Sequence, residues 1–329
     1  MYPIRAVVPC RACLSGEDLD WLGGGRSVSL ALGLMTTVEV RPAAASDGGA
    51  EDGAEDGWQR EVWAFLRARL AGLGPRPPAV VVRSRAPSAS GLSSSTARIV
   101  ALFRAFADAA LPGRRLSDAT ITQWAYEFEF AVFNGGGMDH LAVVEGGALL
   151  LDGREQGLPS VRDRMEFPEG WRVVVVDSGT RKDTGHHIRD VRAQLASGDP
   201  ALAAYRSAAD EASGRVWEAL RGRDLAALGA AMSDAHAAMR DHQGMSTPLL
   251  EELRAVALRS AGLPLKLSGA GGGGALVGVC PVDEVAGTVE RLVRALGVSH
   301  PGARVVPTAA APGTRRGPVP VAGGQMKGS

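Results

Sequence analysis

A strand that runs directly into a hydroxyl-rich helix start constrains the fold of this chain more than any other feature. Residues 78–86 (PAVVVRSRA) are apolar and rich in β-branched side chains, which favours a strand. PSASGLSSSTA follows at 87–97. Beyond it, apolar side chains recur at helical spacing on one face: Ile99, Leu102, Phe103, Phe106 and Ala110. The pattern predicts a strand–loop–helix unit.

The hydroxyls of this loop allow two interpretations. Ser and Thr are common helix caps, so the loop could simply begin a helix. Backbone N–H groups and hydroxyls at a helix N-terminus also form an anion site, most often for phosphate. A Walker A loop is excluded as the source of that site, because no G-x-x-x-x-G-K-[ST] run occurs in the chain.

Strand and helix patterns occur in both halves of the chain, which predicts an α+β fold. Strands are expected at 1–14, 27–40, 146–152 and 171–179, and a strand–glycine turn–strand at 263–281. Helices are expected at 58–73, 118–134, through most of 200–260, and over VDEVAGTVERLVRALG. The acidic stretch 43–57 and the segment 177–192 are interpreted as solvated loops, and the residues from Pro312 onward as a disordered tail.

Charge and apolar content exclude some classes of partner. Basic and acidic side chains balance at 36 each in 329 residues, so no net field attracts nucleic acid or an anionic membrane. No segment approaches the roughly 20 apolar residues of a membrane helix, and the N-terminus lacks the apolar stretch of a signal peptide. We therefore expect no nucleic-acid or membrane partner.

The cysteines indicate the compartment. Cys10, Cys13 and Cys280 are an odd, small set, as suits a reducing cytoplasm. Cys10 and Cys13 form a C-x-x-C that could be a redox motif or half a metal site. With no second pair and a strand-like setting, two small residues at a strand edge is the favoured interpretation.

Four segments, taken together, resemble the GHMP kinase superfamily. PSASGLSSSTA is similar to its phosphate loop, and KLSGAGGGGALV (266–277) to its glycine-rich third motif. CRACLSGEDLDWLGG (10–24) resembles the first motif in its galactokinase version. GGGMDHLAVVEGGALLLD (135–152) resembles the galactokinase segment that carries the catalytic Asp. The matches run in family order and span nearly the whole chain.

The resemblance implies a two-lobed α+β kinase with the active site between the lobes. The expected division is an N-terminal domain over 1–160 with the phosphate loop, a C-terminal domain over 161–311, and a tail over 312–329. ATP and Mg²⁺ are the implied cofactors.

The glycine loops are the implied nucleotide site. Gly91 would let backbone approach the phosphates closely, and Gly269 and Gly273 would do so in the third motif. The amides and hydroxyls after Gly91 would face the anion. The expected nucleotide-binding residues are Gly91, Leu92, Ser93, Ser94, Ser95, Thr96, Gly271 and Gly272.

The resemblance also implies a magnesium site. It places a magnesium-binding Ser at the end of the serine run, which is Ser95, with Ser94 as the alternative. It places the carboxylate twelve positions before Asp139, at Glu127. Glu129 should point to a different face of the helix. Mg²⁺ usually takes only one or two carboxylates from protein, so this set is sufficient.

Asp139 and Arg11 are the implied catalytic residues. By resemblance Asp139 is the base that takes the proton of the acceptor hydroxyl, and Arg11 lies five positions before Gly16 as in galactokinases. Arg11 would keep Asp139 ionised and offset charge on the attacking oxygen. Phosphoryl transfer depends mainly on positioning and charge stabilisation, so one acid, one cation and Mg²⁺ suffice.

The segment GEDLDW supplies carboxylates suited to a polyol. Glu17, Asp18 and Asp20 repel one another unless donors such as sugar hydroxyls bind them. The galactokinase pattern has Glu, His and Asp here, so Asp18 replaces a His and alters the hydroxyl pattern that the site would read. The expected acceptor-binding residues are Glu17, Asp18, Asp20, Gly137, Asp139 and Gly271.

The sequence therefore predicts a cytoplasmic, ATP-dependent sugar kinase, galactokinase-like, acting on an anomeric hydroxyl. Alternatives are a kinase of a cyclitol or unusual sugar in secondary metabolism, a kinase of mevalonate- or homoserine-type alcohols, and a non-catalytic sugar sensor. The expected partner is a small-molecule polyol, with the protein a monomer or homodimer.

Overall fold

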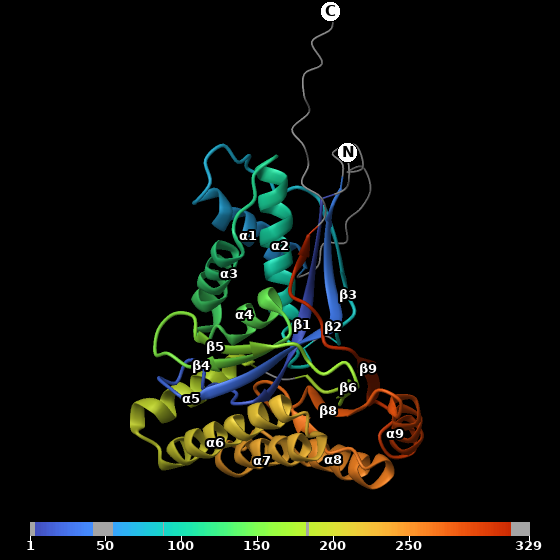
Figure 1. Ribbon diagram of the computed structural model, residues 1–329. Helices are drawn as coiled ribbons and strands as arrows, with labels where there is room; N and C mark the ends of the chain where they lie inside the picture. Colours follow the sequence, from blue (N-terminus) through green and yellow to red (C-terminus); the bar gives the residue numbers. More distant parts are fainter. Residues whose placement is uncertain (1–3, 42–54, 88, 182–183, 317–329) are drawn as a thin grey trace, which may run out of the picture.

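The computed structural model describes residues 4–41, 55–87, 89–181 and 184–316. Within these ranges the chain builds two antiparallel sheets with helices on their faces (Figure 1). The predicted α+β class is confirmed. Residues 43–54 of the predicted acidic loop and Ser88 of the phosphate loop lie outside the described residues.

The first sheet carries the long strands. Its order is β10–β1–β2–β4–β5, and β3 also pairs with β2. The strand predicted over 27–40 is one long strand, β2. The bounds are β1 Arg5–Ser15, β2 Arg26–Val40, β3 Val80–Ser84, β4 Ala148–Asp152, β5 Ser160–Met165 and β10 Arg315–Arg316. The β1–β2 pairing shifts register between Pro9 and Cys10, just before Arg11.

Helices of the first half cover one side of this sheet. They are α1 Glu55–Arg67, α2 Ser94–Ala110, α3 Asp118–Phe133 and α4 Met138–Glu145. Phe65, Phe103 and Phe128 meet edge to face, with ring centroids 5.3–5.8 Å apart, and this cluster joins α1, α2 and α3. Because α2 is fixed by this packing, the loop at its N-terminus has a defined position.

The second sheet has the order β7–β8–β6–β9. Its strands are β7 Lys266–Leu267, β8 Ala275–Pro281, β6 Trp171–Asp177 and β9 Arg304–Thr308. The helices of this half are α5 Thr184–Ser197, α6 Pro200–Gly222, α7 Leu225–Gln243, α8 Pro248–Ala261 and α9 Val285–Ser299. In Figure 1, α6, α7 and α8 lie side by side below the first sheet. Asp199, Asp224 and Thr247 cap α6, α7 and α8 through their side chains.

The two halves share a core. One buried apolar cluster contains Leu30 and Phe103 of the first half together with Val175, Trp217 and Val277 of the second. The parts that flank the site are therefore packed together rather than joined by a free hinge.

Three expectations about elements change. β5 belongs to the first sheet, so that half extends to Met165 rather than to residue 160. Residues 312–316 are not a disordered tail: β10 pairs with β1, and Thr314 N–H donates to Val144 O. Residues 317–329 lie outside the described ranges. The predicted solvated loop 177–192 includes the first nine residues of α5, which begins at Thr184 and ends at Ser197.

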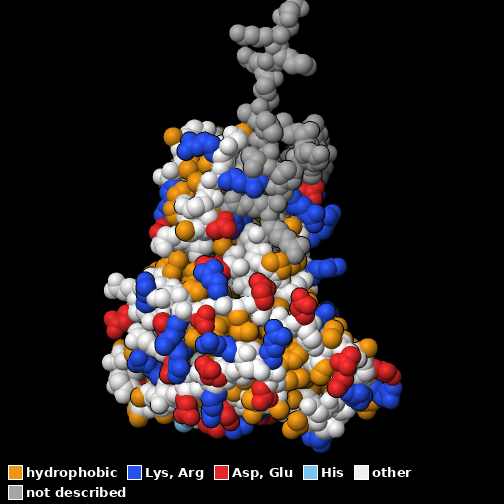
Figure 2. Space-filling view, in the orientation of Figure 1, with side chains coloured by type: hydrophobic (Ala, Val, Ile, Leu, Met, Phe, Trp, Pro, Cys, Tyr) orange, Lys and Arg blue, Asp and Glu red, His pale blue; other side chains and the backbone are white. Residues whose placement is uncertain are grey.

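The surface agrees with the balanced charge. Basic and acidic side chains are interspersed over the face drawn in Figure 2. Among the described helices, none combines the length and the apolarity that crossing a bilayer requires.

Candidate active site

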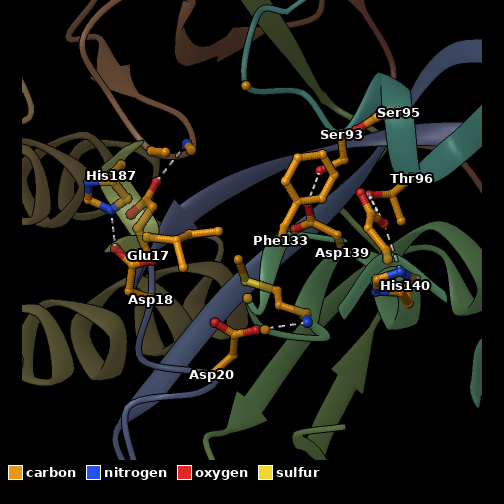
Figure 3. A pocket seen from close by; sticks show the side chains of 18 of the residues that line it. Glu17, Asp18, Asp20, Ser93, Ser95, Thr96, Phe133, Asp139, His140 and His187 are labelled. Atoms are coloured by element: carbon orange, nitrogen blue, oxygen red, sulfur yellow. Dashed lines mark hydrogen bonds and ion pairs between the residues drawn. The ribbon is translucent and has the colours of Figure 1, made fainter. Parts of the chain in front are cut away.

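A cavity of about 580 Å³ lies where the phosphate loop, the β1–β2 connection and the starts of α4 and α5 meet (Figure 3). Residues from distant parts of the sequence converge on it. Eleven of the residues that the sequence predicted line it: Arg11, Glu17, Asp18, Asp20, Gly91, Ser93, Ser94, Ser95, Thr96, Asp139 and Gly269.

Arg11 joins three parts of the site. Its Nε and Nη2 atoms each lie 2.6 Å from Asp139 Oδ1. Its Nη1 donates to Gly91 O at 2.6 Å, and its backbone N–H donates to Leu92 O at 3.1 Å. The side chain is only 5% exposed, so this guanidinium is a buried cation. β1, the phosphate loop and the start of α4 are therefore held together by one charged side chain.

Asp139 is held in its charged form. It lies in the first turn of α4, and Ser93 Oγ donates to its second oxygen, Oδ2. Burial acts to raise the pKa of Asp139, but the Arg11 charge and the hydrogen bonds from Ser93 and Arg11 outweigh it. The pKa of Asp139 therefore stands below its usual value of 3.8 and the group is a carboxylate at neutral pH.

The phosphate loop has two residues with left-handed backbone, and this conformation directs the Ser93 hydroxyl to Asp139. Gly91 has φ +82° and Ser93, the N-cap of α2, has φ +56°. A left-handed non-glycine residue is costly and concentrates at functional sites. The Ser93 hydroxyl does not cap the helix; it is directed to Asp139. The first N–H groups of α2 have no partner within the helix and are available to an anion.

The third glycine motif packs directly on the phosphate loop. Ala275 N–H donates to Ser90 O at 2.7 Å, and Ser268 Oγ donates to Gly91 O at 3.3 Å. Gly274 has φ +84°, and a Cβ built there would lie 2.7 Å from Ser90 O. The two loops are therefore in backbone contact, and glycine is required where they meet.

Each of the three carboxylates of the acidic segment, Glu17, Asp18 and Asp20, contacts a different residue. Glu17 Oε1 accepts from Lys266 Nζ at 2.5 Å, while Glu17 Oε2 is buried without a hydrogen-bond partner in the described structure. Asp18 Oδ2 lies 2.6 Å from His187 Nε2. Asp20 Oδ2 accepts from Met138 N–H at 2.9 Å.

The carboxylate near the phosphate loop is Glu129, and the placement of Glu127 at this site was wrong. Glu127 lies outside the cavity, 40% exposed, and pairs with Arg69 at 3.0 Å. Glu129 lines the cavity and accepts from Thr96 Oγ1 at 2.9 and 3.1 Å. His140 Nε2 lies 2.9 Å from Glu129 Oε2.

Five further predicted residues do not line the cavity: Leu92, Gly137, Gly271, Gly272 and Gly273. The Leu92 side chain is buried in the core, and only its backbone carbonyl reaches Arg11. Gly137 is the N-cap of α4, and a Cβ there would meet Leu158. Gly271 faces Met245, and Gly272 N–H donates to Met245 O. Gly269 and Ala270 are the residues of this motif that line the cavity.

The pattern of α3 contains the signal for Glu129. Thr122, Ala125 and Tyr126 are buried and define its inner face, and Glu129 falls on that face by helical spacing. Gln123 and Glu127 fall on the outer face and hydrogen-bond each other. His187 and Lys266 carry no such signal, because tertiary packing alone brings them to the acidic segment.

Comparison with known proteins identifies the family. The family model of the GHMP kinases N-terminal domain matches residues 60–147, and the model of the GHMP kinases C-terminal domain matches residues 217–298. A mevalonate kinase from Aeropyrum pernix is 31% identical over 70% of this chain and 69% of its own length. The chain belongs to the GHMP kinase family. A galactokinase from Mycobacterium bovis is 28% identical over 93% of this chain and 97% of its own length.

Solved structures show the same fold. Lactococcus lactis galactokinase complexed with galactose has a TM-score of 0.77 at 15% identity and covers 95% of both chains. A mevalonate kinase structure has a TM-score of 0.72 at 16% identity over 93% of this chain. The wide coverage by galactokinases supports the galactokinase-like branch.

Membership settles the class of reaction. GHMP kinases are phosphotransferases with ATP as donor, and the galactokinase and mevalonate kinase relatives act on alcohol groups; this GHMP kinase is a phosphotransferase of that class.

The contact between the two glycine loops gives a prediction. Gly274→Ala places a methyl group against Ser90 O and strains a left-handed backbone, so we expect ATP affinity to fall by about tenfold or more. Gly72→Ala is the matched control, because Gly72 has φ +83° but nothing within 4 Å of its Cβ position. Nucleotide titration of both variants measures the effect. Equal ATP affinity in the two variants would contradict the packing argument.

Proposed function

We propose that this enzyme transfers the γ-phosphoryl group of ATP to a hydroxyl of a sugar, in galactokinase-like fashion to the anomeric hydroxyl. The observation that carries the proposal is the Arg11–Asp139 contact at the phosphate loop, beside a cavity half formed by Glu17, Asp18 and Asp20. A base and a phosphate-binding loop thus face a region suited to hydroxyl donors.

The chemistry assigns a role to each group around Asp139. The acceptor oxygen forms a bond to the γ-phosphorus, the bond from that phosphorus to the β,γ-bridging oxygen breaks, and ADP leaves. The hydroxyl proton passes to Asp139. Its low pKa is compatible with this role, because the transition state is loose and the proton can move late. Arg11 orients the carboxylate, and Ser93 fixes its other oxygen.

The residues at the start of α2 fit a nucleotide with Mg²⁺. Mg²⁺ selects oxygen ligands and usually retains waters and substrate phosphates, so one carboxylate and one hydroxyl from protein fit it. Glu129 and Ser95 would hold it, with Ser94 as the alternative hydroxyl. When bound, Mg²⁺ neutralises charge on the phosphates. The amides of Ser94 and Thr96 would bind phosphate oxygens.

The charge of the acceptor half favours a neutral polyol. Glu17 and Asp18 are each matched by one basic side chain, Lys266 and His187, but no cation contacts Asp20 in the described structure. Among the described residues of this half, a carboxylate on the acceptor would therefore meet net negative charge. Mevalonate- and homoserine-type acceptors, which carry a carboxylate, are therefore disfavoured.

Two alternatives differ in support. A cyclitol or an unusual sugar is the second candidate acceptor, because Asp18 stands where the galactokinase pattern has His. A non-catalytic sugar sensor is disfavoured, since the base, its cation and the phosphate loop are assembled together. The proposed partner is a small molecule.

An acceptor panel tests the proposal. ADP release is measured with ATP, Mg²⁺ and each of D-galactose, D-glucose, N-acetylgalactosamine, myo-inositol, mevalonate and homoserine. We expect a sugar or the cyclitol to be the best acceptor. Asp139→Asn should lower kcat by about a hundredfold or more, in the range of general-base losses, and leave ATP binding intact. Mevalonate or homoserine as best acceptor, or an unaffected Asp139→Asn, would contradict the proposal.

The two carboxylates of α3 separate the magnesium assignments. Glu129→Gln should raise the Mg²⁺ concentration needed for half-maximal rate by about tenfold or more, because a charged ligand is lost. Glu127→Gln is the matched control on the outer face and should behave as wild type. A Mg²⁺ titration of initial rate distinguishes them. A raised Mg²⁺ requirement in Glu127→Gln and a wild-type requirement in Glu129→Gln would assign the metal to Glu127.

Asp20 predicts a pH dependence. Burial raises its pKa to about 7, the Met138 N–H bond acts the other way, and the charges of Asp139 and Asp18 raise it further while Arg11 lowers it. The carboxylate form, which would accept a hydrogen bond from a hydroxyl of the substrate, is thus present above pH 7 and lost below it.

We therefore expect kcat/KM for the acceptor to fall about tenfold per pH unit below about pH 7, since that parameter follows ionisation of the free enzyme. Asp20→Asn should have a lower kcat/KM that is flat through this range. A wild-type profile that stays level from pH 8 to about 5 would show that Asp20 does not bind the acceptor as a carboxylate.

A further inference from the structure

Asp18 and His187 form a contact that the reaction as described does not use. Asp18 Oδ2 lies 2.6 Å from His187 Nε2, although the two residues are far apart in the sequence. Both line the cavity, and their side chains are 11% and 13% exposed. Figure 3 shows the pair on the wall that carries Glu17, away from the Ser93–Asp139 contact. The pair is therefore part of the acceptor half.

Helix α5 is fixed where it presents His187. One turn further along the helix, Arg192 Nε donates to Asn134 O at 3.0 Å, and the guanidinium lies 4.8 Å from the Trp21 ring centroid. Ile188 approaches Gly135 so closely that a Cβ on the glycine would lie 3.0 Å from Ile188 Cδ1. These contacts make the start of α5 a defined wall of the cavity.

The turn around Asp18 does not depend on the pair for its shape. Asp18 has φ +66°, and its Oδ1 accepts from Trp21 Nε1 at 3.2 Å. Trp21 N–H donates to Asp18 O, and Tyr205 Oη donates to Glu17 O at 2.7 Å. Because the turn has these bonds of its own, a second contact from another helix is not needed to hold it.

The chemistry of the pair suits recognition of a hydroxyl group. A carboxylate alone only accepts hydrogen bonds, whereas an imidazole beside it adds a nitrogen whose role adjusts to the neighbour. The galactokinase pattern has a His at position 18 itself. In this chain the imidazole reaches the same wall from α5, and a carboxylate occupies position 18. Relative to the galactokinase pattern, the imidazole therefore comes from a different position, and the side chain at position 18 is a carboxylate instead of an imidazole.

We propose that Asp18 and His187 are a specificity-determining pair that contacts a hydroxyl of the acceptor other than the one phosphorylated. The inference rests on the proposed function, because it assumes a polyol in this cavity. On this proposal, selectivity among polyols depends on a contact between the β1–β2 connection and α5, and not on Glu17, Asp18 and Asp20 alone.

Single variants test the pair. His187→Ala and Asp18→Asn should each lower kcat/KM for the acceptor about ten- to one-hundredfold, the loss expected for a hydrogen bond involving a charged group. The loss should appear in acceptor KM, with KM for ATP within about twofold of wild type. Asn tolerates the left-handed backbone of position 18, so Asp18→Asn keeps the turn. His186→Ala is the matched control, since His186 is exposed and pairs with Asp190 on the surface.

The exchange Asp18→His with His187→Asp gives a second readout. His also tolerates a left-handed backbone, so the double variant can rebuild the contact with its partners reversed. We expect it to recover much of the acceptor kcat/KM lost by its component single variants, Asp18→His and His187→Asp, which is a coupling that independent positions do not show. Additive losses, or single variants with wild-type acceptor KM, would overturn the proposal.

These assays use D-galactose as the acceptor or, if another compound of the panel is a better acceptor, that compound. If mevalonate or homoserine is best, the sugar assignment fails, but the variants still decide whether the pair contacts the acceptor. If a sugar is best and both single variants match His186→Ala, the pair proposal fails and the sugar assignment stands. No ADP release with any member would contradict both.

Discussion

The buried contact of Arg11 with Asp139 and Gly91 O is the interaction on which the site depends. An isolated buried guanidinium or carboxylate would cost several kcal/mol, and close pairing with added hydrogen bonds offsets that cost. Arg11 meets this condition, since two of its nitrogens reach Asp139 and a third reaches the phosphate-loop backbone. The same contact brings Asp139 to the phosphate loop and keeps it ionised, so the position and the charge of this carboxylate depend on one interaction.

The surrounding backbone reinforces this arrangement from the second half of the molecule. Ala275 N–H and Ser268 Oγ hydrogen-bond to the phosphate loop, and Gly274 allows the close approach. Lys266, at the other end of the same motif, binds Glu17. One short segment therefore supports the nucleotide side and the acceptor side together, and the shared apolar core fixes its position.

The sequence predicted the parts of the site that lie in continuous motifs. Arg11, Asp139 and Ser93 were identified from the resemblance of their segments to GHMP kinase motifs, and the structure brings all three into contact. The α+β class followed from alternating and helical patterns. The error at Glu127 arose from counting positions along the chain, whereas the buried face of α3 selects Glu129.

Other features could not be predicted from local patterns. His187 was assigned to a solvated loop, and its position beside Asp18 depends on the packing of α5 against Trp21 and Gly135. Residues 312–316 return to the first sheet although their composition resembles a linker. In both cases contacts distant in sequence outweigh local composition.

The most direct test of the account is a crystal structure of the enzyme with a non-hydrolysable ATP analogue, Mg²⁺ and its best acceptor. The account predicts the γ-phosphate at the start of α2, between the phosphate loop and Gly269. It also predicts an acceptor hydroxyl within hydrogen-bond distance of Asp139. A nucleotide bound elsewhere, or an acceptor whose reacting hydroxyl faces away from Asp139, would contradict it.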